Sequence, residues 1–264
     1  MNVAAARGND AMPRRIDAAI VGVQKCGTTS LAAMLAEHPQ VCLAAGKEAH
    51  LFDDPEVQRS GVATARFDGL FAHRRPGQLL LDATPSYLYL PGCLEALLVH
   101  NPDVKVIVVL RPAGERAVSH HDHERRRGVE RRSLPVALLV ERWRLRRDRE
   151  PLSPSSAHRV AAYLDRGRYA AQLHRLLGLT ARVHVLTLAD LVAEPDRVFA
   201  EVQRFLGVEV VPAGVVPQLN VGSAAPGSLI RWWLDVVTRR EMARTADVLG
   251  EPEASLRPTP RGRR

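Results

Sequence analysis

A short run of glycine, lysine and threonine residues has the types and spacing needed to bind a phosphate group. It reads Gly22-Val-Gln-Lys25-Cys-Gly27-Thr28-Thr29 and follows an apolar stretch at 16–23. Glycines let the backbone curl so that successive N–H groups converge on one anion, and the start of a following helix adds partial positive charge. Lys25 adds a full charge, and the threonines add hydroxyl donors. The run therefore predicts a phosphate-binding loop between a strand and a helix.

The loop differs from the nucleoside-triphosphate motif G-x-x-x-x-G-K-[ST] in the position of its lysine. Thr28 follows the second glycine, and the cation stands inside the loop at Lys25. A kinase needs lysine on the outer phosphates and an acid that holds magnesium. The segment LLLD, which ends at Asp82, has the form of such a metal-binding strand. A P-loop nucleotide kinase is therefore one alternative, and an ordinary turn with a solvated lysine is another.

A second anion-binding pair follows the most strand-like segment of the chain, VKVIVVL at 104–110. Arg111 stands directly after it, and Ser119 lies two helical turns further on. An arginine at a strand end suits a phosphate, because the guanidinium group donates two parallel hydrogen bonds to its oxygens. Arg116, between them, is expected to pair with a carboxylate. Two phosphate sites on one sheet predict a nucleotide that carries phosphates at both its 5′ and 3′ ends.

Strands and helices alternate along the chain, and this order must bring the two loops together. A P-loop-type α/β fold with three layers follows, in which helices flank a mostly parallel central sheet. The carboxyl ends of such strands form the ligand crevice. The sequence predicts strands at 16–23, 41–44, 79–82, 104–110 and 183–188, and helices at 28–37, 91–100, 115–150 with breaks near Gly128 and Pro135, 163–177, 194–206 and 229–249.

Composition narrows the class of protein further. The 264 residues suit one domain, predicted at 16–249 between a flexible leader at 1–15 and a disordered tail at 250–264. A net charge of +8 indicates anionic partners. The three cysteines have no CxxC pair, and neither a signal peptide nor an 18-residue apolar run is present. We expect a cytoplasmic protein without stable membrane insertion and without a metal site.

Arginines are dense between 125 and 149, whereas only three of the 37 basic residues are lysines. One interpretation is a solvated face whose arginines pair with Glu124, Glu130, Glu141 and Asp148. Another is a basic rim that attracts an anionic acceptor. A non-catalytic module that binds anions or nucleic acid is a third reading, but aromatic residues make up only 5% of the chain. We therefore expect no nucleic-acid partner. The histidines at 120, 121 and 123 are poorly spaced for a metal site.

Taken together, these segments resemble the sulfotransferases that use 3′-phosphoadenosine 5′-phosphosulfate (PAPS), in particular the branch that includes the heparan sulfate sulfotransferases. The resemblance runs in order from about residue 16 to 210. It is carried by GVQKCGTTSLAAMLAEHP at 22–39, KEAHLFD at 47–53, DATPSYL at 82–88, VIVVLRPAGERAVSHH at 106–121, RGRYAAQLHRLL at 166–177 and the segment 183–208 that contains FLG.

The resemblance implies a role for each matching residue. On the donor side, Lys25 would stabilise charge on the departing 5′-phosphate, Arg111 and Ser119 would hold the 3′-phosphate, and Tyr169 would lie near the nucleotide. On the acceptor side, Glu48 would be the general base, with Lys47 and His50 beside it. The remaining residues of the implied PAPS-binding loop are Gln24, Cys26, Gly27, Thr28, Thr29 and Ser30.

Three departures from the family pattern stand out. Asp82-Ala83 replaces the usual Glu-Lys pair, which implies the loss of a substrate contact. The loop 220–228 lacks the basic residue and glycine that close over the nucleotide, and the chain after Leu249 is atypical. We predict in-line transfer of a sulfuryl group from PAPS to a hydroxyl, with an amine as the alternative. The acceptor would be a small molecule or a glycan, and the sequence leaves its identity and the oligomeric state open.

Overall fold

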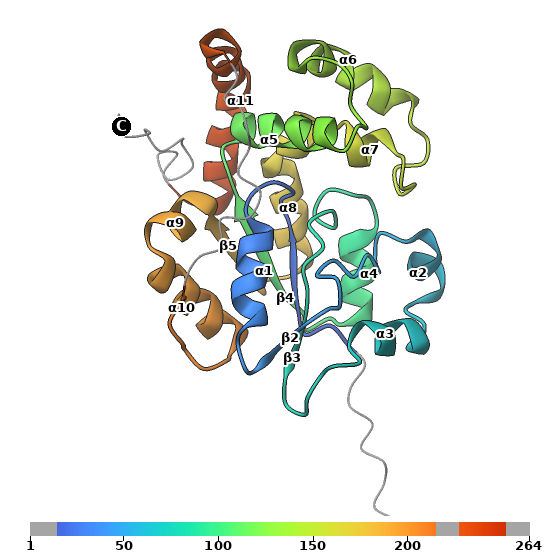
Figure 1. Ribbon diagram of the computed structural model, residues 1–264, viewed down its shortest axis with the longest axis vertical. Helices are drawn as coiled ribbons and strands as arrows, with labels where there is room; N and C mark the ends of the chain where they lie inside the picture. Colours follow the sequence, from blue (N-terminus) through green and yellow to red (C-terminus); the bar gives the residue numbers. More distant parts are fainter. Residues whose placement is uncertain (1–14, 215–226, 252–264) are drawn as a thin grey trace, which may run out of the picture.

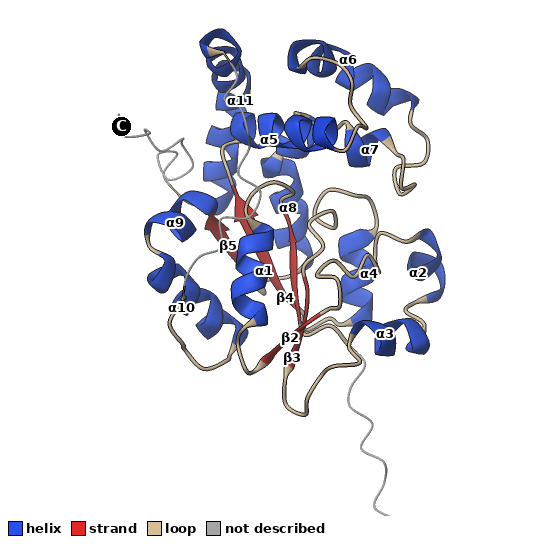
Figure 2. Ribbon diagram, in the orientation of Figure 1, coloured by secondary structure: helices blue, strands red, loops and turns tan. Residues whose placement is uncertain are grey.

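The computed structural model describes residues 15–214 and 227–251, and within them five parallel strands form one sheet. Helices lie against both faces of the sheet (Figure 1 and Figure 2), which confirms the predicted α/β class with three layers. The strands are β1 (Ala18–Gly22), β2 (Val41–Leu43), β3 (Leu79–Asp82), β4 (Lys105–Leu110) and β5 (Val183–Thr187). The helices are α1 (Thr28–Ala36), α2 (Pro55–Ser60), α3 (Thr64–Leu70), α4 (Cys93–His100), α5 (Ala113–Arg126), α6 (Leu134–Arg147), α7 (Ala157–Val160), the single 3₁₀ turn η1 (Asp165–Gly167), α8 (Tyr169–Leu179), α9 (Leu188–Ala193), α10 (Pro195–Leu206) and α11 (Ser228–Leu249).

The two central strands are buried because both of their faces are covered. Every residue of β1 is buried, and in β4 every residue after Lys105 is buried. Near-continuous apolar strands are what a parallel sheet between two helical layers requires. These strands form the centre of the main core, which also includes α1, α4, α8 and α10.

The sheet order β2-β3-β1-β4-β5 puts the topological switch point between β1 and β4. From β1 the chain crosses toward β2 at one edge, and from β4 it crosses toward β5 at the other. Ligands of open parallel sheets bind at the carboxyl ends of the strands where the chain turns in opposite directions. The loops after β1 and β4, which carry Lys25 and Arg111, therefore flank this switch point.

A second, smaller core lies beyond the carboxyl ends of the strands. It joins α5, α6 and the segment around α7 to the first half of α11, through Ala117, Leu138, Tyr163 and Leu234 among others. Figure 1 shows α6 and the start of α11 at one end of the molecule, on the far side of α5 from the sheet. This end is the one toward which the carboxyl ends of the strands point.

Most predicted elements are present, with boundaries shifted by one or two residues. The long helical stretch breaks at Gly128, which has a φ of 74°, and Pro135 lies in the first turn of α6. The helix predicted at 163–177 is wrong over its first six residues, because η1 and an irregular turn precede α8. Four short helices, α2, α3, α7 and α9, were not predicted. The leader 1–15 and the tail 250–264 lie almost wholly outside the described residues.

Candidate active site

The loop between β1 and α1 has the shape that an anion-binding loop requires. Gly27, at the N-cap of α1, has a φ of 90°, and a Cβ atom there would lie 2.5 Å from a methyl carbon of Leu188. Only glycine fits this position without strain or collision. Thr28 and Ser30 are buried in the first turn of the helix that follows.

Lys25 is the cation of this loop. Its side chain is half-buried, and burial together with the positive charge of Arg126 lowers the pKa of its amine. Within the described residues no carboxylate forms an ion pair with Lys25 Nζ, although the charges of Glu48 and Glu124 act on it from a distance. A partly desolvated lysine without a paired carboxylate is suited to bind an anionic ligand.

Two neighbours of Lys25 make contacts that hold the loop in place. Gln24 Oε1 accepts a hydrogen bond of 3.0 Å from the buried Arg166. Cys26 is fully buried, its N–H donates to Val23, and its thiol lies 3.8 Å from the hydroxyl of Tyr169. Burial raises the pKa of this thiol to about 11. The Cys26 side chain therefore packs in the core.

The end of β4 is tied to the same loop by Tyr169. The Tyr169 hydroxyl donates to the carbonyl oxygen of Arg111 at 3.0 Å, while its oxygen lies beside Cys26. Arg111 itself binds Glu115 through Nε and Nη2, and Nη1 has no hydrogen-bond partner among the described residues. Ser119 lies on α5, two turns further on. The structure thus brings the two predicted anion sites to neighbouring strand ends.

Arg116 does not pair with a carboxylate as the sequence predicted. It is fully buried and donates to the backbone carbonyl oxygens of Ala162 and Tyr163, with His120 alongside. Buried carbonyl oxygens outside a helix or sheet need a hydrogen-bond donor, and the guanidinium group of an arginine has several. Arg116 therefore holds the segment before η1 against α5.

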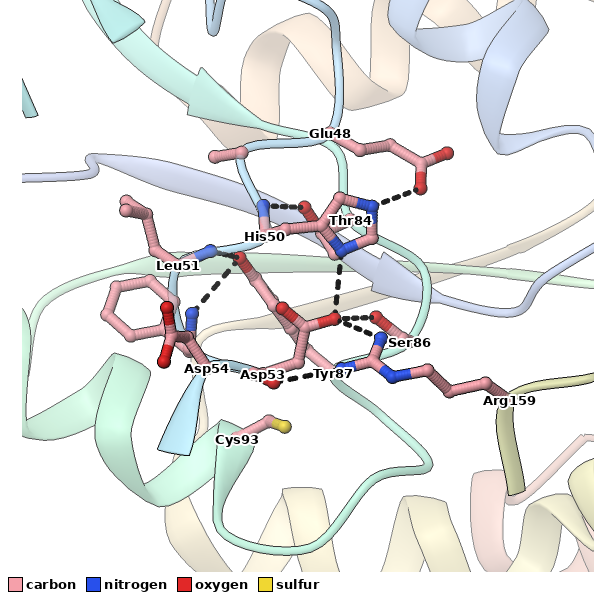
Figure 3. Close-up of polar contacts among 12 residues, drawn as sticks. Glu48, His50, Leu51, Asp53, Asp54, Thr84, Ser86, Tyr87, Cys93 and Arg159 are labelled. Carbon is pink, nitrogen blue, oxygen red and sulfur yellow. Dashed lines mark hydrogen bonds and ion pairs between the residues drawn. The ribbon is translucent and has the colours of Figure 1, made fainter. Parts of the chain in front are cut away.

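Glu48 lies between two cationic groups in the segment that links β2 to α2. Lys47 Nζ donates to its Oε1. His50 Nε2 lies 3.2 Å from its Oε2, a contact that Figure 3 shows. Burial disfavours the charged form of Glu48, but the hydrogen bonds and charges of His50 and Lys47 outweigh burial and lower its pKa. Glu48 is therefore an ionised carboxylate at neutral pH.

His50 connects Glu48 to a buried carboxylate, Asp53. Its Nδ1 lies 2.9 Å from Asp53 Oδ2, and the hydrogen bonds to Asp53 and Glu48 raise the pKa of the imidazole to about 9. Arg159 Nη1, at 2.7 Å, and Ser86 Oγ, at 2.9 Å, donate to the same oxygen of Asp53 (Figure 3). Glu48, His50, Asp53 and Arg159 thus form one line of alternating charge.

Asp82 anchors this segment from the end of β3. It is fully buried and accepts hydrogen bonds from the N–H of Ala49, the hydroxyl of Thr84 and the hydroxyl of Tyr87. The Tyr87 oxygen in turn accepts from the N–H of Leu51 at 2.9 Å. Asp82 is therefore committed to holding the backbone beside Glu48. This role speaks against its use as a magnesium ligand.

The backbone at the predicted site is strained. Lys25, Lys47 and His50 are the residues other than glycine with positive φ in the described ranges, at 69°, 73° and 47°. Such angles are unfavourable for residues with a Cβ atom, and they cluster at functional sites. The three strained residues are all ones that the sequence placed at the site.

Some of the arginine–acid pairs considered above are present, between Arg127 and Glu124 and between Arg144 and Glu130, but the acids are buried and not solvated. Glu124, Glu130 and Glu141 are buried, and each binds neighbouring backbone or arginine groups. Glu130 accepts from Arg144 and from the hydroxyl of Tyr163, and nearby cations and N–H groups overcome its burial and lower its pKa to about 2. These acids are internal anchors of the second core, whereas Arg125, Arg126 and Arg127 remain exposed.

The family is decided by a model of the sulfotransferase domain, which matches residues 15–219. The chain belongs to this family. This chain is 31% identical over 211 residues to mouse heparan sulfate glucosamine 3-O-sulfotransferase 6. The alignment covers 79% of this chain and 56% of that protein. The human protein of the same name is 31% identical over 196 residues, with 74% and 53% covered. The chain spans about half the length of these curated relatives.

Solved structures agree with this assignment. A sulfotransferase from Alicyclobacillus acidocaldarius superposes on this sulfotransferase domain with a TM-score of 0.75 at 28% identity, covering 92% of this chain and 99% of that one. A sulfotransferase domain from the curacin biosynthetic pathway shares the fold, with a TM-score of 0.52 at 18% identity and coverage of 90% and 98%.

The sulfotransferase domain has residues that fit a nucleotide with two phosphates. Lys25 and the glycine-shaped loop are at the end of β1, and Arg111 with Ser119 is at and beyond the end of the adjacent β4. PAPS, which the family uses, carries phosphate groups at the 3′ and 5′ positions of its ribose. Most of the loop 220–228, where the family's closing element would fall, lies outside the described residues.

Sequence reasoning missed the residues that support Glu48 from a distance. Asp53 lies in the KEAHLFD segment, but the resemblance assigns it no role. Its position three residues after His50 was the one sequence signal that the two side chains could pair. Arg159 and Ser86 gave no signal, because their contacts with Asp53 join segments far apart in the chain. In the part of the chain that the structure describes, no group of three or more metal-binding side chains occurs.

Proposed function

We propose that this chain transfers the sulfuryl group of PAPS to a hydroxyl group by in-line displacement. One observation carries the proposal above all others. Lys25 of the phosphate loop follows β1, and the segment that carries the ionised Glu48 is tied through the N–H of Ala49 to Asp82 at the end of β3, the strand beside β1. A base and a cation on opposite sides of one reacting centre are what a displacement between two oxygens needs.

On the donor side, Lys25 and the N–H groups at the start of α1 stabilise the negative charge that develops on the 5′-phosphate. Their positive charge is held by the fold before reaction, so little reorganisation is needed. Arg111 and Ser119 hold the 3′-phosphate and fix the direction of the donor. PAPS supplies a sulfuryl group on a phosphate leaving group.

On the acceptor side, Glu48 takes the proton of the attacking hydroxyl. The raised pKa of His50 keeps the imidazole protonated at neutral pH, so that it orients the carboxylate and does not compete for the proton. Lys47 binds the other oxygen of Glu48 and lines the acceptor side. Asp53 and Arg159 fix the position of His50 from behind.

For the acceptor, we propose a hydroxyl on a glycan or a glycan-like small molecule. The relatives described above are named as 3-O-sulfotransferases of a glucosamine, which supports oxygen over nitrogen as the attacking atom. The cytoplasmic location expected from the sequence stays a proposal. The three cysteines are free and buried, which is compatible with a reducing compartment.

Calorimetry with adenosine 3′,5′-bisphosphate, followed by an acceptor screen with labelled PAPS, tests the function. We expect binding of the bisphosphate to be much tighter than binding of AMP, because AMP lacks the 3′-phosphate for Arg111. Equal binding of the two nucleotides, or magnesium-dependent phosphoryl transfer from ATP, would contradict the proposal.

A further inference from the structure

An apolar stripe on the first half of α11 is exposed although it has the spacing of a buried helix face. Leu229, Trp232, Trp233, Val236 and Val237 follow the pattern i, i+3, i+4, i+7, i+8, and they are 79, 66, 41, 51 and 42% exposed. On a helix, residues at this spacing share one face. The face that packs on α5 is a different one, formed by Ile230 and Leu234.

Helix α6 carries a similar stripe. Val136, Leu139 and Trp143 follow the pattern i, i+3, i+7 and are 45, 82 and 56% exposed, while Ala137 and Leu138 face the second core. Arg147 lies over the ring of Trp143 at 4.2 Å from its centroid. The three tryptophans of the whole chain are therefore all exposed, and all lie on these two stripes.

The two stripes lie at the same end of the molecule. Figure 1 shows α6 and the start of α11 projecting beyond α5, at the end toward which the carboxyl ends of the strands point. Each stripe adjoins exposed arginines: Arg142, Arg146 and Arg147 on α6, and Arg239 and Arg240 at the end of the stripe on α11. Asp235 is the exposed acid within the stripe segment of α11, and the single acid of α6, Glu141, is buried.

We propose that this end of the molecule binds peripherally to the surface of an anionic lipid bilayer. Helices that lie in a membrane interface combine tryptophan and aliphatic residues on one side with arginine around them, which is the composition of these stripes. The net charge of +8 attracts the chain to an anionic surface. A second copy of the chain is a poorer occupant, because pairing like stripes would bring their arginines together. No helix in the described ranges is long and apolar enough to cross a bilayer.

Tryptophan fluorescence reports on this surface directly, since the chain has no tryptophan elsewhere. The full chain would be mixed with vesicles of phosphatidylcholine and phosphatidylglycerol in equal parts, and with vesicles of phosphatidylcholine alone. We expect a blue shift of the emission and co-sedimentation with the anionic vesicles. The absence of both signals with anionic vesicles would overturn the proposal.

Variants separate insertion of the stripes from adsorption by net charge. Trp232→Ser with Trp233→Ser should lower the partition coefficient at least about tenfold, and Arg239→Gln should lower it about fivefold. Val99→Ser, at an isolated valine of α4 that is 86% exposed, should change nothing. Because all these side chains are exposed, the thermal unfolding midpoint should stay unchanged. Vesicle binding that is insensitive to the tryptophan substitutions and vanishes at high salt would mean adsorption by charge alone, and would overturn the proposal.

Analytical ultracentrifugation of the same proteins tests the rival occupant. The wild-type chain should sediment as the same species with and without the two serine substitutions. A dimer that these substitutions abolish would assign the stripe to self-association and overturn the membrane proposal.

Discussion

The two halves of the candidate active site are held in place in different ways. The donor-side loop is built mainly from adjacent residues: a buried strand, a glycine with positive φ and a helix start. The acceptor-side segment 47–53 has little regular structure, and it is held by side chains from β3, the turn after it and α7. Local sequence thus accounts for the shape of the first, with added support from Arg166 and Tyr169, whereas the second depends mainly on long-range contacts. Substitutions can test this contrast.

The largest effect is expected at Glu48. Replacement by glutamine removes the base but keeps the shape, so turnover should fall by about 10²–10⁴-fold while the affinity for adenosine 3′,5′-bisphosphate is unchanged. Assays with labelled PAPS and calorimetry measure the two quantities. Glu56→Gln, at an exposed position of α2, is the matched control and should change neither. Wild-type turnover in Glu48→Gln would remove Glu48 from the mechanism.

On the donor side, Lys25→Ala should reduce both quantities. Turnover should fall by about 10²–10³-fold, because one preorganised charge at the leaving group is lost, and nucleotide affinity should fall with it. The control is Lys105→Met, since Lys105 donates to the carbonyl oxygen of Leu206 at the amino end of β4, away from the loop at Lys25. If Lys25→Ala bound the bisphosphate as tightly as the wild type, the loop would not be the phosphate site.

The long-range support of the acceptor side predicts a cost in stability. Arg159→Ala leaves the carboxylate of Asp53, which is 2% exposed, with His50 as its one remaining cation among the described residues, so the free energy of unfolding should fall by about 2 kcal/mol. Urea unfolding measures this change. Arg197→Ala, in a surface pair with Glu194 and Glu201, should cost less than about 1 kcal/mol. Equal costs for the two substitutions would show that Asp53 does not depend on Arg159.

A smaller effect is expected in the pH profile. His50 has a folded pKa of about 9, above its ordinary value of 6.5, so its pairing with Asp53 and Glu48 is complete below pH 6.5 and is lost as the pH rises through about 9. Turnover should therefore decline near pH 9 as Glu48 loses its partner. His50→Gln should flatten this alkaline limb at a lower plateau. An unchanged limb in the variant would assign the decline to another group, such as Lys25.

The same contrast explains what could be predicted from the sequence. Strands such as β4 and the loop at Lys25 were predictable because their apolar runs, glycines and helix start are contiguous. Glu48 became a candidate only through the resemblance to a known family, since a carboxylate in a loop has no local signature. Arg159 could not be found, because its contact with Asp53 spans 106 positions and leaves no periodicity in the chain. The buried Glu130 was misread as solvated for a related reason. Its partner Tyr163 comes from a distant segment that closes over it.

The left-handed backbone of Lys25, Lys47 and His50 matters for any attempt to raise the thermal stability of this protein. A residue with a Cβ atom loses about 1–2 kcal/mol in that conformation, whereas glycine there costs about 0.5–1 kcal/mol of extra chain freedom. At Lys25, which forms no ion pair among the described residues, glycine should therefore make the fold slightly more stable and catalysis worse. At Lys47 and His50 the same change would remove cations from Glu48 and Asp53, so selection for heat resistance alone would erode the phosphate loop but not the acceptor side.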